Sequence, residues 1–125
     1  MKLHVDNTSG LNLFTSYGPG FVAVNHKRYE RNVLILPEHV ELDWTHHDFA
    51  SLTVADFSKL ATLGADVILL GTGNKLHFPH PSLQAPLMAA GIGLEVMDTT
   101  AACRTYNILA GEGRKAAAAL LVEAP

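Results

Sequence analysis

The chain has 125 residues, enough for one domain that buries about two-thirds of the surface exposed by its unfolded state. Charged residues make up 17% of it and the formal net charge is −3, so no basic face is available to neutralise nucleic-acid phosphates. The single cysteine excludes an internal disulfide and a zinc site built from several cysteines.

The first ten residues, MKLHVDNTSG, lack the apolar core of a signal peptide, and the apolar run at 116–122 is too short to span a membrane. We therefore expect a cytoplasmic chain in a reducing compartment. With no repeats and no linker-like stretch, residues 1–125 are expected to form a single domain.

The first 45 residues have the character of β-strands. Residues 11–17 and 21–25 flank Gly18-Pro19-Gly20, which predicts a hairpin, and residues 25–28 form a second polar turn. Residues 32–36 form an apolar run that ends before Pro37, as in a strand covered on both faces.

Residues 40–44 alternate between apolar and acidic side chains, which predicts a strand with one face in solvent. Thr53 then suits a helix N-cap, with Asp56 three residues later as in a capping box, and Gly64 ends this helix. The apolar side of the helix is predicted to hold Val54, Phe57, Leu60 and Ala61.

The second half of the chain alternates between strands and helices. Strands are predicted at 66–70 and 94–97. Helices are predicted from Pro81 or Ser82 to Gly91, with Pro86 in or near the first turn, and over 99–111. Residues 114–123 suit helix by their four alanines and strand by Leu120-Leu121-Val122. We choose a strand, because the alternation calls for a third parallel strand.

These elements predict an α/β fold in which antiparallel β-hairpins pack with a C-terminal β-α-β-α-β unit. Right-handed crossovers place strands 66–70 and 94–97 parallel, as neighbours. The loops that follow them then meet at one sheet edge, the usual ligand position in such folds. The candidate ligand-binding residues at this edge are Gly71, Thr72, Gly73, Asp98, Thr99, Cys103 and Arg104.

The glycine loop has two readings. Exposed amides at Gly71-Thr72-Gly73, beside a helix N-terminus, would attract a small anion. However, Leu76 stands where a dinucleotide-binding loop has its third glycine, and no Gly-Lys-Ser/Thr follows as in a P-loop. A tight turn after a buried strand is the other reading, and it is favoured.

Cys103 is the sharpest candidate for chemistry. In the first turn of a helix its pKa would fall and the reactive thiolate would be favoured. The helical wheel instead places Cys103 at the edge of the core face, where a free cysteine serves as a small apolar residue. The second reading is favoured. No histidine has a predicted position next to Cys103, and His77 or His80, just beyond the glycine loop, is the candidate base.

The neighbouring polar residues also have structural alternatives. Asp98 suits a helix N-cap better than a general base, and Arg104 either binds an anion or is solvated. His46-His47-Asp48 and His77-x-x-His80 are read as polar loops, so we expect no metal site and no cofactor. Ile108 points away from the core face and suits a second layer or a partner surface.

The chain resembles a family of small uncharacterised α/β proteins of bacteria and mitochondria, most strongly from Ile68 to Leu121. The family includes a mitochondrial assembly factor for respiratory complex I and the adipogenesis-associated domain proteins, and the closest likeness is to its short proteobacterial members. The matching motifs are Leu70-Gly71-Thr72-Gly73, Gly91-Ile92, Glu95-Val96-Met97-Asp98-Thr99, Ala102-Cys103-Arg104-Thr105-Tyr106-Asn107 and Glu112-Gly113-Arg114.

The resemblance implies one α/β domain with a mixed sheet, of a three-layer β/β/α type, and it supports the final strand. It supplies no catalytic residue. We therefore expect a non-catalytic interaction or assembly protein with a protein partner. A small anionic-ligand binding protein or a Cys103-dependent enzyme at the carboxyl edge is the alternative. Whether the chain is an enzyme and which oligomeric state it adopts stay open.

Overall fold

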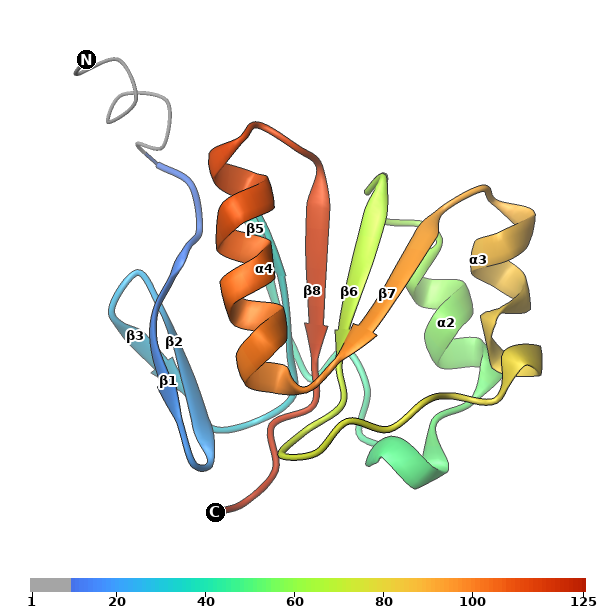
Figure 1. Ribbon diagram of the computed structural model, residues 1–125, viewed down its shortest axis with the longest axis horizontal. Helices are drawn as coiled ribbons and strands as arrows, with labels where there is room; N and C mark the ends of the chain where they lie inside the picture. The colour runs from blue at the N-terminus through green and yellow to red at the C-terminus, as the bar shows by residue number, and fades with distance from the viewer. Residues whose placement is uncertain (1–9) are drawn as a thin grey trace.

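The computed structural model describes residues 10–125, which form two β-sheets and several short helices (Figure 1). The strands are β1 (Phe14–Gly18), β2 (Phe21–Val24), β3 (Lys27–Tyr29), β4 (Val33–Leu36), β5 (His39–Leu42), β6 (Val67–Gly71), β7 (Gly93–Met97) and β8 (Ala116–Leu120). The helices are η1 (Phe49–Ser51), α2 (Val54–Leu60), η2 (Pro81–Gln84), α3 (Ala85–Ala89) and α4 (Thr99–Gly111).

The small sheet is an antiparallel meander of three strands in the order β1-β2-β3. The first hairpin turns at Pro19-Gly20, where Gly20 has a φ of +80° that favours glycine. The second turns at Asn25 and His26, whose φ values of 48° and 70° suit a two-residue hairpin loop. The first predicted turn is confirmed, and the second is shorter than predicted, because Lys27 and Arg28 belong to β3.

The large sheet has five strands in the order β5-β4-β8-β6-β7. β6 runs parallel to β7 and to β8, while β4 runs antiparallel to β8 and β5. The mixed sheet, the parallel neighbours β6 and β7, and the final strand are therefore confirmed. β8 is a strand despite its alanines, because it lies between two partner strands and all five of its residues are buried.

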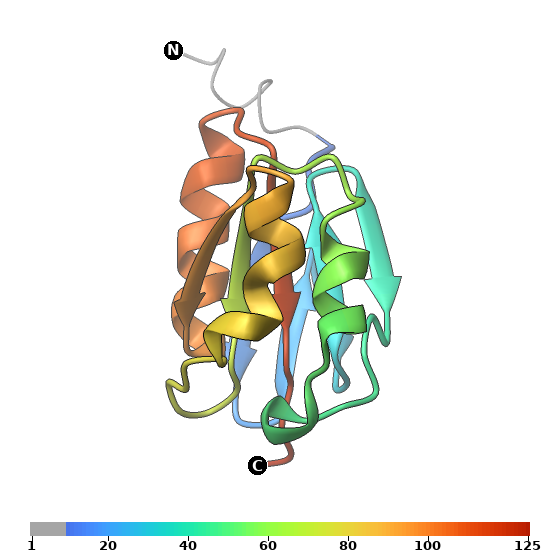
Figure 2. The same ribbon diagram turned by 90° about the vertical axis from the view of Figure 1, so that its right-hand side faces the viewer.

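The large sheet is covered on both faces (Figures 1 and 2). On one face α4 and the small sheet share a core with β4, β6 and β8, in which Phe14, Leu69, Cys103 and Tyr106 are buried. On the other face α2, η2 and α3 cover a second core that includes Leu34, Phe57, Ile68 and Leu87. The predicted layered α/β architecture is confirmed.

Three local predictions differ from the structure. Val54, predicted on the apolar side of its helix, is 46% exposed, because it is the first residue of α2 and the buried residues of this helix, Phe57 and Leu60, come later. The helix predicted up to Gly91 is divided into η2 and α3, and Pro86 lies in the first turn of α3 as expected. Trp44 follows β5 rather than belonging to it, and its buried Nε1 donates to the Leu120 carbonyl at 3.0 Å.

Candidate functional site

The two loops predicted to converge at the carboxyl edge of β6 and β7 are bonded directly to each other. The Gly73 amide donates to Thr99 Oγ1 at 2.9 Å, and the Thr99 amide donates to the Gly73 carbonyl at 3.0 Å. The Thr72 amide donates to the Met97 carbonyl at 2.9 Å. The predicted meeting of the loops therefore takes the form of a closed junction.

The hydroxyl and carboxylate groups of this junction also have partners within the chain. Thr99 Oγ1 donates to the Leu121 carbonyl at 2.8 Å, and the buried Thr72 Oγ1 donates to the Lys75 carbonyl at 2.6 Å. Asp98 accepts from the Ala101 amide at 2.8 Å, which confirms its role as the N-cap of α4. These bonds hold the ends of β6, β7 and β8 together.

A carboxylate of the chain itself lies against the glycine loop. Glu123 Oε1 accepts from the Asn74 amide at 2.5 Å, and a Cβ added at Gly73 would lie 2.1 Å from the same oxygen. The cavity between this loop and the β1–β2 hairpin measures about 20 Å³, room for about one water molecule. An external anion would have to displace Glu123, so the binding residues named for this edge stay a prediction.

Gly71 has a packing reason to be glycine. A Cβ at this position would lie 2.7 Å from Leu120 Cδ2 and 3.0 Å from the Cα of Thr99. The start of α4 could not approach the end of β6 this closely past a larger side chain.

Of the two readings of Cys103, the structure disagrees with the one in which the helix N-terminus lowers the pKa of the thiol. The helix begins at Thr99, so Cys103 lies beyond the first turn, and its side chain is fully buried in the core between α4 and the sheet. Burial raises the pKa of this thiol to about 12. Cys103 is therefore a packing residue, as the favoured reading predicts.

Arg104 and Ile108 point away from the core, as the helical wheel predicts. Both are exposed, and Ile108 keeps 62% of its surface in solvent. Arg104 forms no ion pair within residues 10–125. Neither side chain lies at the closed junction of the loops.

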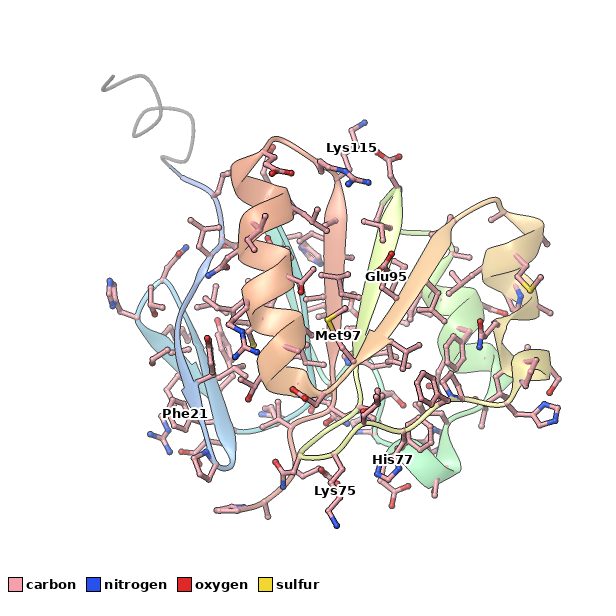
Figure 3. The ribbon with its side chains drawn as sticks, in the orientation of Figure 1. Phe21, Lys75, His77, Glu95, Met97 and Lys115 are labelled. Carbon is pink, nitrogen blue, oxygen red and sulfur yellow. The ribbon has the colours of Figure 1, made fainter. Side chains whose placement is uncertain are left out.

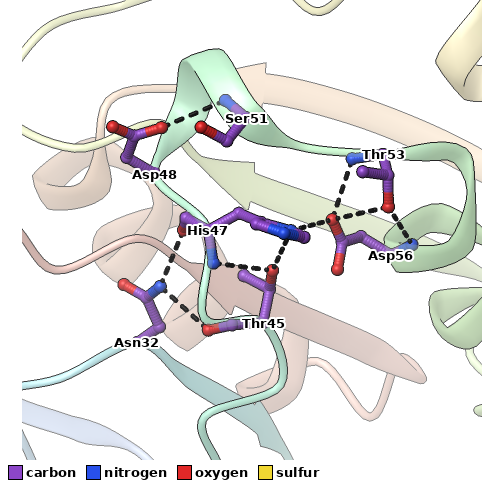
Figure 4. A network of polar contacts seen from close by, with 7 residues as sticks. All are labelled: Asn32, Thr45, His47, Asp48, Ser51, Thr53 and Asp56. Atoms are coloured by element: carbon purple, nitrogen blue, oxygen red, sulfur yellow. Dashed lines mark hydrogen bonds and ion pairs between the residues drawn. The ribbon is translucent and has the colours of Figure 1, made fainter.

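A polar network links the chain after β5 to the start of α2 (Figure 4). His47 Nδ1 lies 3.0 Å from Asp56 Oδ2, and Asp56 also accepts from the Thr53 amide at 2.8 Å to complete the predicted capping box. Asn32 donates to the carbonyls of Thr45 and His47 at 3.1 Å each. His47 thus fastens a loop to a helix end, consistent with a polar loop.

His77, one of the two histidines considered as a base, is placed away from the thiol. The His77 ring stacks on Phe49 with a centroid separation of 5.0 Å, and Phe49 packs against the core on the α2 face (Figure 3). Cys103 belongs to the core on the opposite face of the sheet, so His77 does not serve as its base. Among the described residues, no group of three or more His, Cys, Asp or Glu side chains is arranged to hold a metal ion.

A large cleft lies at the opposite end of the β6 and β8 strands, where the sequence suggested nothing. It measures about 690 Å³ and lies among the β4–β5 turn, the α2–β6 connection and the α4–β8 connection. Glu38 and Glu112 contribute negative charge to its lining, and Arg114 and Lys115 contribute positive charge. Gly64, Gly111 and Gly113 line this cleft, and no atom of a more distant described residue lies within 4 Å of a Cβ added at any of the three.

Several large apolar side chains are exposed on the loop after β6 and on the helices. The exposed fractions are 49% for Leu76, 73% for Phe78, 73% for Met88 and 62% for Ile108. Sequence reasoning singled out Ile108 alone. Apolar residues between Gly73 and Pro79, in a stretch with turn composition, were the signal that could have identified Leu76 and Phe78.

Comparison with known proteins gives one family and a set of similar folds. Residues 14–121 match the family model described as "Protein of unknown function (DUF498/DUF598)". A mouse protein named NADH dehydrogenase (ubiquinone) 1 alpha subcomplex assembly factor 3 is 36% identical over 70% of this chain and 48% of its own length. The chain thus aligns with about half of this relative.

Two solved bacterial structures have the same fold. A crystal structure of a Bordetella parapertussis protein is 40% identical, with a TM-score of 0.85 over 92% of this chain and 98% of that one. A solution structure from Bordetella pertussis, described as an Mth938-like domain, is 33% identical, with a TM-score of 0.79 over 93% and 89%. Within residues 10–125, no helix has the length and apolar character needed to cross a membrane.

Proposed function

The chain belongs to the DUF498/DUF598 family of proteins of unknown function, and from this premise we propose that it is a non-catalytic interaction protein that assists the assembly of a protein complex. The name of the mouse relative supports an assembly role. Since the chain aligns with about half of that relative, respiratory complex I is one candidate complex among others.

The observation that carries this proposal is the exposure of apolar side chains on one loop. Phe78 keeps 73% and Leu76 keeps 49% of its surface in solvent, although both are large enough to contribute to a core. Large apolar surface left in contact with water is typical of a protein-binding surface. The polar groups of the neighbouring junction are meanwhile bonded to one another, which suits support of this surface better than chemistry on a substrate.

The test is affinity capture of the tagged full chain from native lysate at mild salt, followed by size-exclusion chromatography and mass spectrometry. We expect a polypeptide in stoichiometric amount with the wild-type chain and much less of it with Phe78→Ser. Leu42→Ser is the matched control, since Leu42 is 46% exposed on β5 at the far edge of the sheet. Elution of the wild-type chain with no stoichiometric partner would overturn the proposal.

A second candidate function rests on the cleft of about 690 Å³. This volume lies within the range of about 300–1,000 Å³ that small-molecule sites occupy. A thermal-shift screen of metabolites tests it, because a ligand that binds the native state raises Tm. A ligand of the cleft should lose its effect in Arg114→Ala, and a screen in which no compound raises Tm contradicts this candidate.

A further inference from the structure

β7 is the outermost strand at one edge of the large sheet, and Figure 2 looks onto this edge. β7 lies there between α4 and α3, with no element drawn across it. None of its five residues is buried, whereas every residue of β6 and β8 is. The outer side of β7 is therefore in contact with solvent.

The hydrogen bonds to β6 show which backbone groups of β7 face outward. The Gly93 amide donates to the Asp66 carbonyl at 3.3 Å, and the Met97 carbonyl accepts from the Thr72 amide at 2.9 Å. Backbone groups alternate in direction along a strand, so the amides and carbonyls of Leu94 and Val96 point away from β6. No other described strand pairs with them.

Two of the other edge strands, β3 and β5, carry charged side chains, which oppose pairing with another strand, and the third, β1, is uncharged but has its Phe14 amide and carbonyl bonded by Asn107 of α4. β3 includes Lys27 and Arg28, and Arg28 forms an ion pair with Glu30. On β5, Glu41 is paired with Lys59 of α2. Such charges are a usual protection of edge strands, and β7 has a single charge among apolar residues.

The negative charge of Glu95, at the centre of β7, determines which side chain a pairing strand can place opposite it. Its side chain lies on the same face of the sheet as α4, together with Met97, and it is exposed (Figure 3). No ion pair joins it to another residue of the described chain. Two copies of β7 paired antiparallel about Glu95 would place two glutamates directly opposite each other, which is unfavourable.

We propose that the edge of β7 binds an extended segment of a partner polypeptide as an added strand, with a lysine or arginine opposite Glu95. This inference rests on the proposed interaction function and adds a second binding surface to the exposed loop of Leu76 and Phe78. The segment would bond to the outward groups of Leu94 and Val96, as in other complexes formed by strand addition. Its side chains on the other face would be apolar, next to Leu94 and Val96, which pack against the core on the α3 face.

The first test is amide hydrogen exchange of the free full chain at several protein concentrations. The amides of Leu94 and Val96 should exchange quickly at every concentration, while the inward amide of Glu95 is protected. Protection of Leu94 and Val96 that grows with concentration would overturn the inference, because a second copy of the chain would then occupy the edge.

The second test is selection of peptides from a random display library on the immobilised wild-type chain. Val96→Pro removes an outward amide and is tolerable at an edge strand, while Val96→Ala keeps that amide and is the matched control. Selected peptides should carry a basic residue among β-branched ones and bind Val96→Pro about tenfold more weakly than Val96→Ala. The selected peptides should also fail to bind the Glu95→Lys variant.

The inference would be overturned if the selected peptides bound Val96→Pro and Val96→Ala with equal affinity, or if the library yielded no peptide that binds this edge. The lysate experiment keeps this failure separate from failure of the proposed function. A partner captured equally by wild type and Val96→Pro would refute the edge and retain the assembly role. No captured partner, with peptides still bound at the edge, would refute the assembly role alone.

Discussion

At the scale of the residue, burial determines the chemistry of Cys103. Its thiol lies among the apolar side chains of the core, where a negative charge would lose its hydration. Tyr106 in the same core is also fully buried, and burial raises its pKa as well. The motif around Cys103 therefore contributes packing to the fold.

The buried thiol predicts a loss of stability at alkaline pH. Burial raises the pKa of Cys103 from 9.0 to about 12, so the unfolded state loses its proton first as pH rises. The stability contributed by this group is complete below pH 9.0 and declines toward pH 12. Urea denaturation at increasing pH should show a smaller alkaline decline in Cys103→Ala than in wild type.

Native Cys103 should also react with iodoacetamide more slowly than free cysteine. Unfolding in urea should restore ordinary reactivity, which provides the control. A thiol that reacts in the native protein faster than free cysteine would contradict the assigned burial and the raised pKa.

Gly73 predicts a second effect at the residue scale. Its φ is +102°, and an added Cβ would meet the Glu123 carboxylate, so Gly73→Ala should destabilise the fold by about 2 kcal/mol or more. Gly64→Ala is the matched control, because Gly64 has a φ of +75° with nothing within 4 Å of an added Cβ. Thermal or urea denaturation should show a clearly larger loss for Gly73→Ala, and equal losses would contradict the close approach of Glu123.

At the scale of the element, side chains at the helix ends decide where α2 and α4 begin. Thr53 and Asp56 exchange hydrogen bonds at the start of α2, and Asp98 caps α4. These bonds satisfy amides that the helix itself leaves free. Both helices begin one residue after the cap that the sequence identifies.

The capping box of α2 predicts a stability change at acid pH. Partial burial acts to raise the pKa of Asp56, but hydrogen bonds from Thr53 and His47 outweigh it and hold the pKa below 3.8. The unfolded state therefore takes up the proton first, and the contribution of Asp56 is lost as pH falls below about 4. Urea denaturation should show wild type more stable than Asp56→Asn at neutral pH, with the difference shrinking on acidification.

Thr53→Ala should cost about 1 kcal/mol at neutral pH, since it removes the other half of the box. Ser58→Ala, at an exposed position within the same helix, is the control and should have little effect. A difference between wild type and Asp56→Asn that does not change between neutral and acid pH would contradict the assigned pKa.

At the scale of the whole molecule, Asn107 fastens the small sheet to α4. Its Oδ1 accepts from the Phe14 amide at 2.8 Å, and its Nδ2 donates to the Phe14 carbonyl at 2.8 Å. Tyr106 adds a hydrogen bond to the Asn12 carbonyl at 2.9 Å and an edge contact with the Phe14 ring. One helix side chain thus takes the place of a neighbouring strand for β1.

Loss of this connection should weaken the whole fold. Asn107→Leu leaves a donor and an acceptor of Phe14 without partners, so we expect a destabilisation of about 2–4 kcal/mol in urea denaturation. Arg104→Leu is the matched control on the exposed side of α4 and should change stability little. Similar losses for the two variants would contradict the role of Asn107.

How much of this could be predicted depends on the range of the interactions. The Gly18-Pro19-Gly20 turn and the Thr53 and Asp98 caps could be predicted because their signals lie within a few residues, and the parallel strand pair because the elements alternate between strand and helix. The role of Asn107 was not predicted, because Phe14 is 93 positions away in the chain. The large cleft was also missed, because separate connections of the chain enclose it.

The sequence by itself determined the succession of elements and the meeting of two loops at one edge of the sheet, because local periodicity, capping and parallel topology require them. Only the tertiary structure decided which groups at these loops and on the neighbouring strand are free to bind a partner. The Glu123 carboxylate accepts from the glycine loop, the core encloses Cys103, and the outer side of β7 is open to solvent. Burial and hydrogen-bond satisfaction depend on residues distant in the chain, which local patterns do not report.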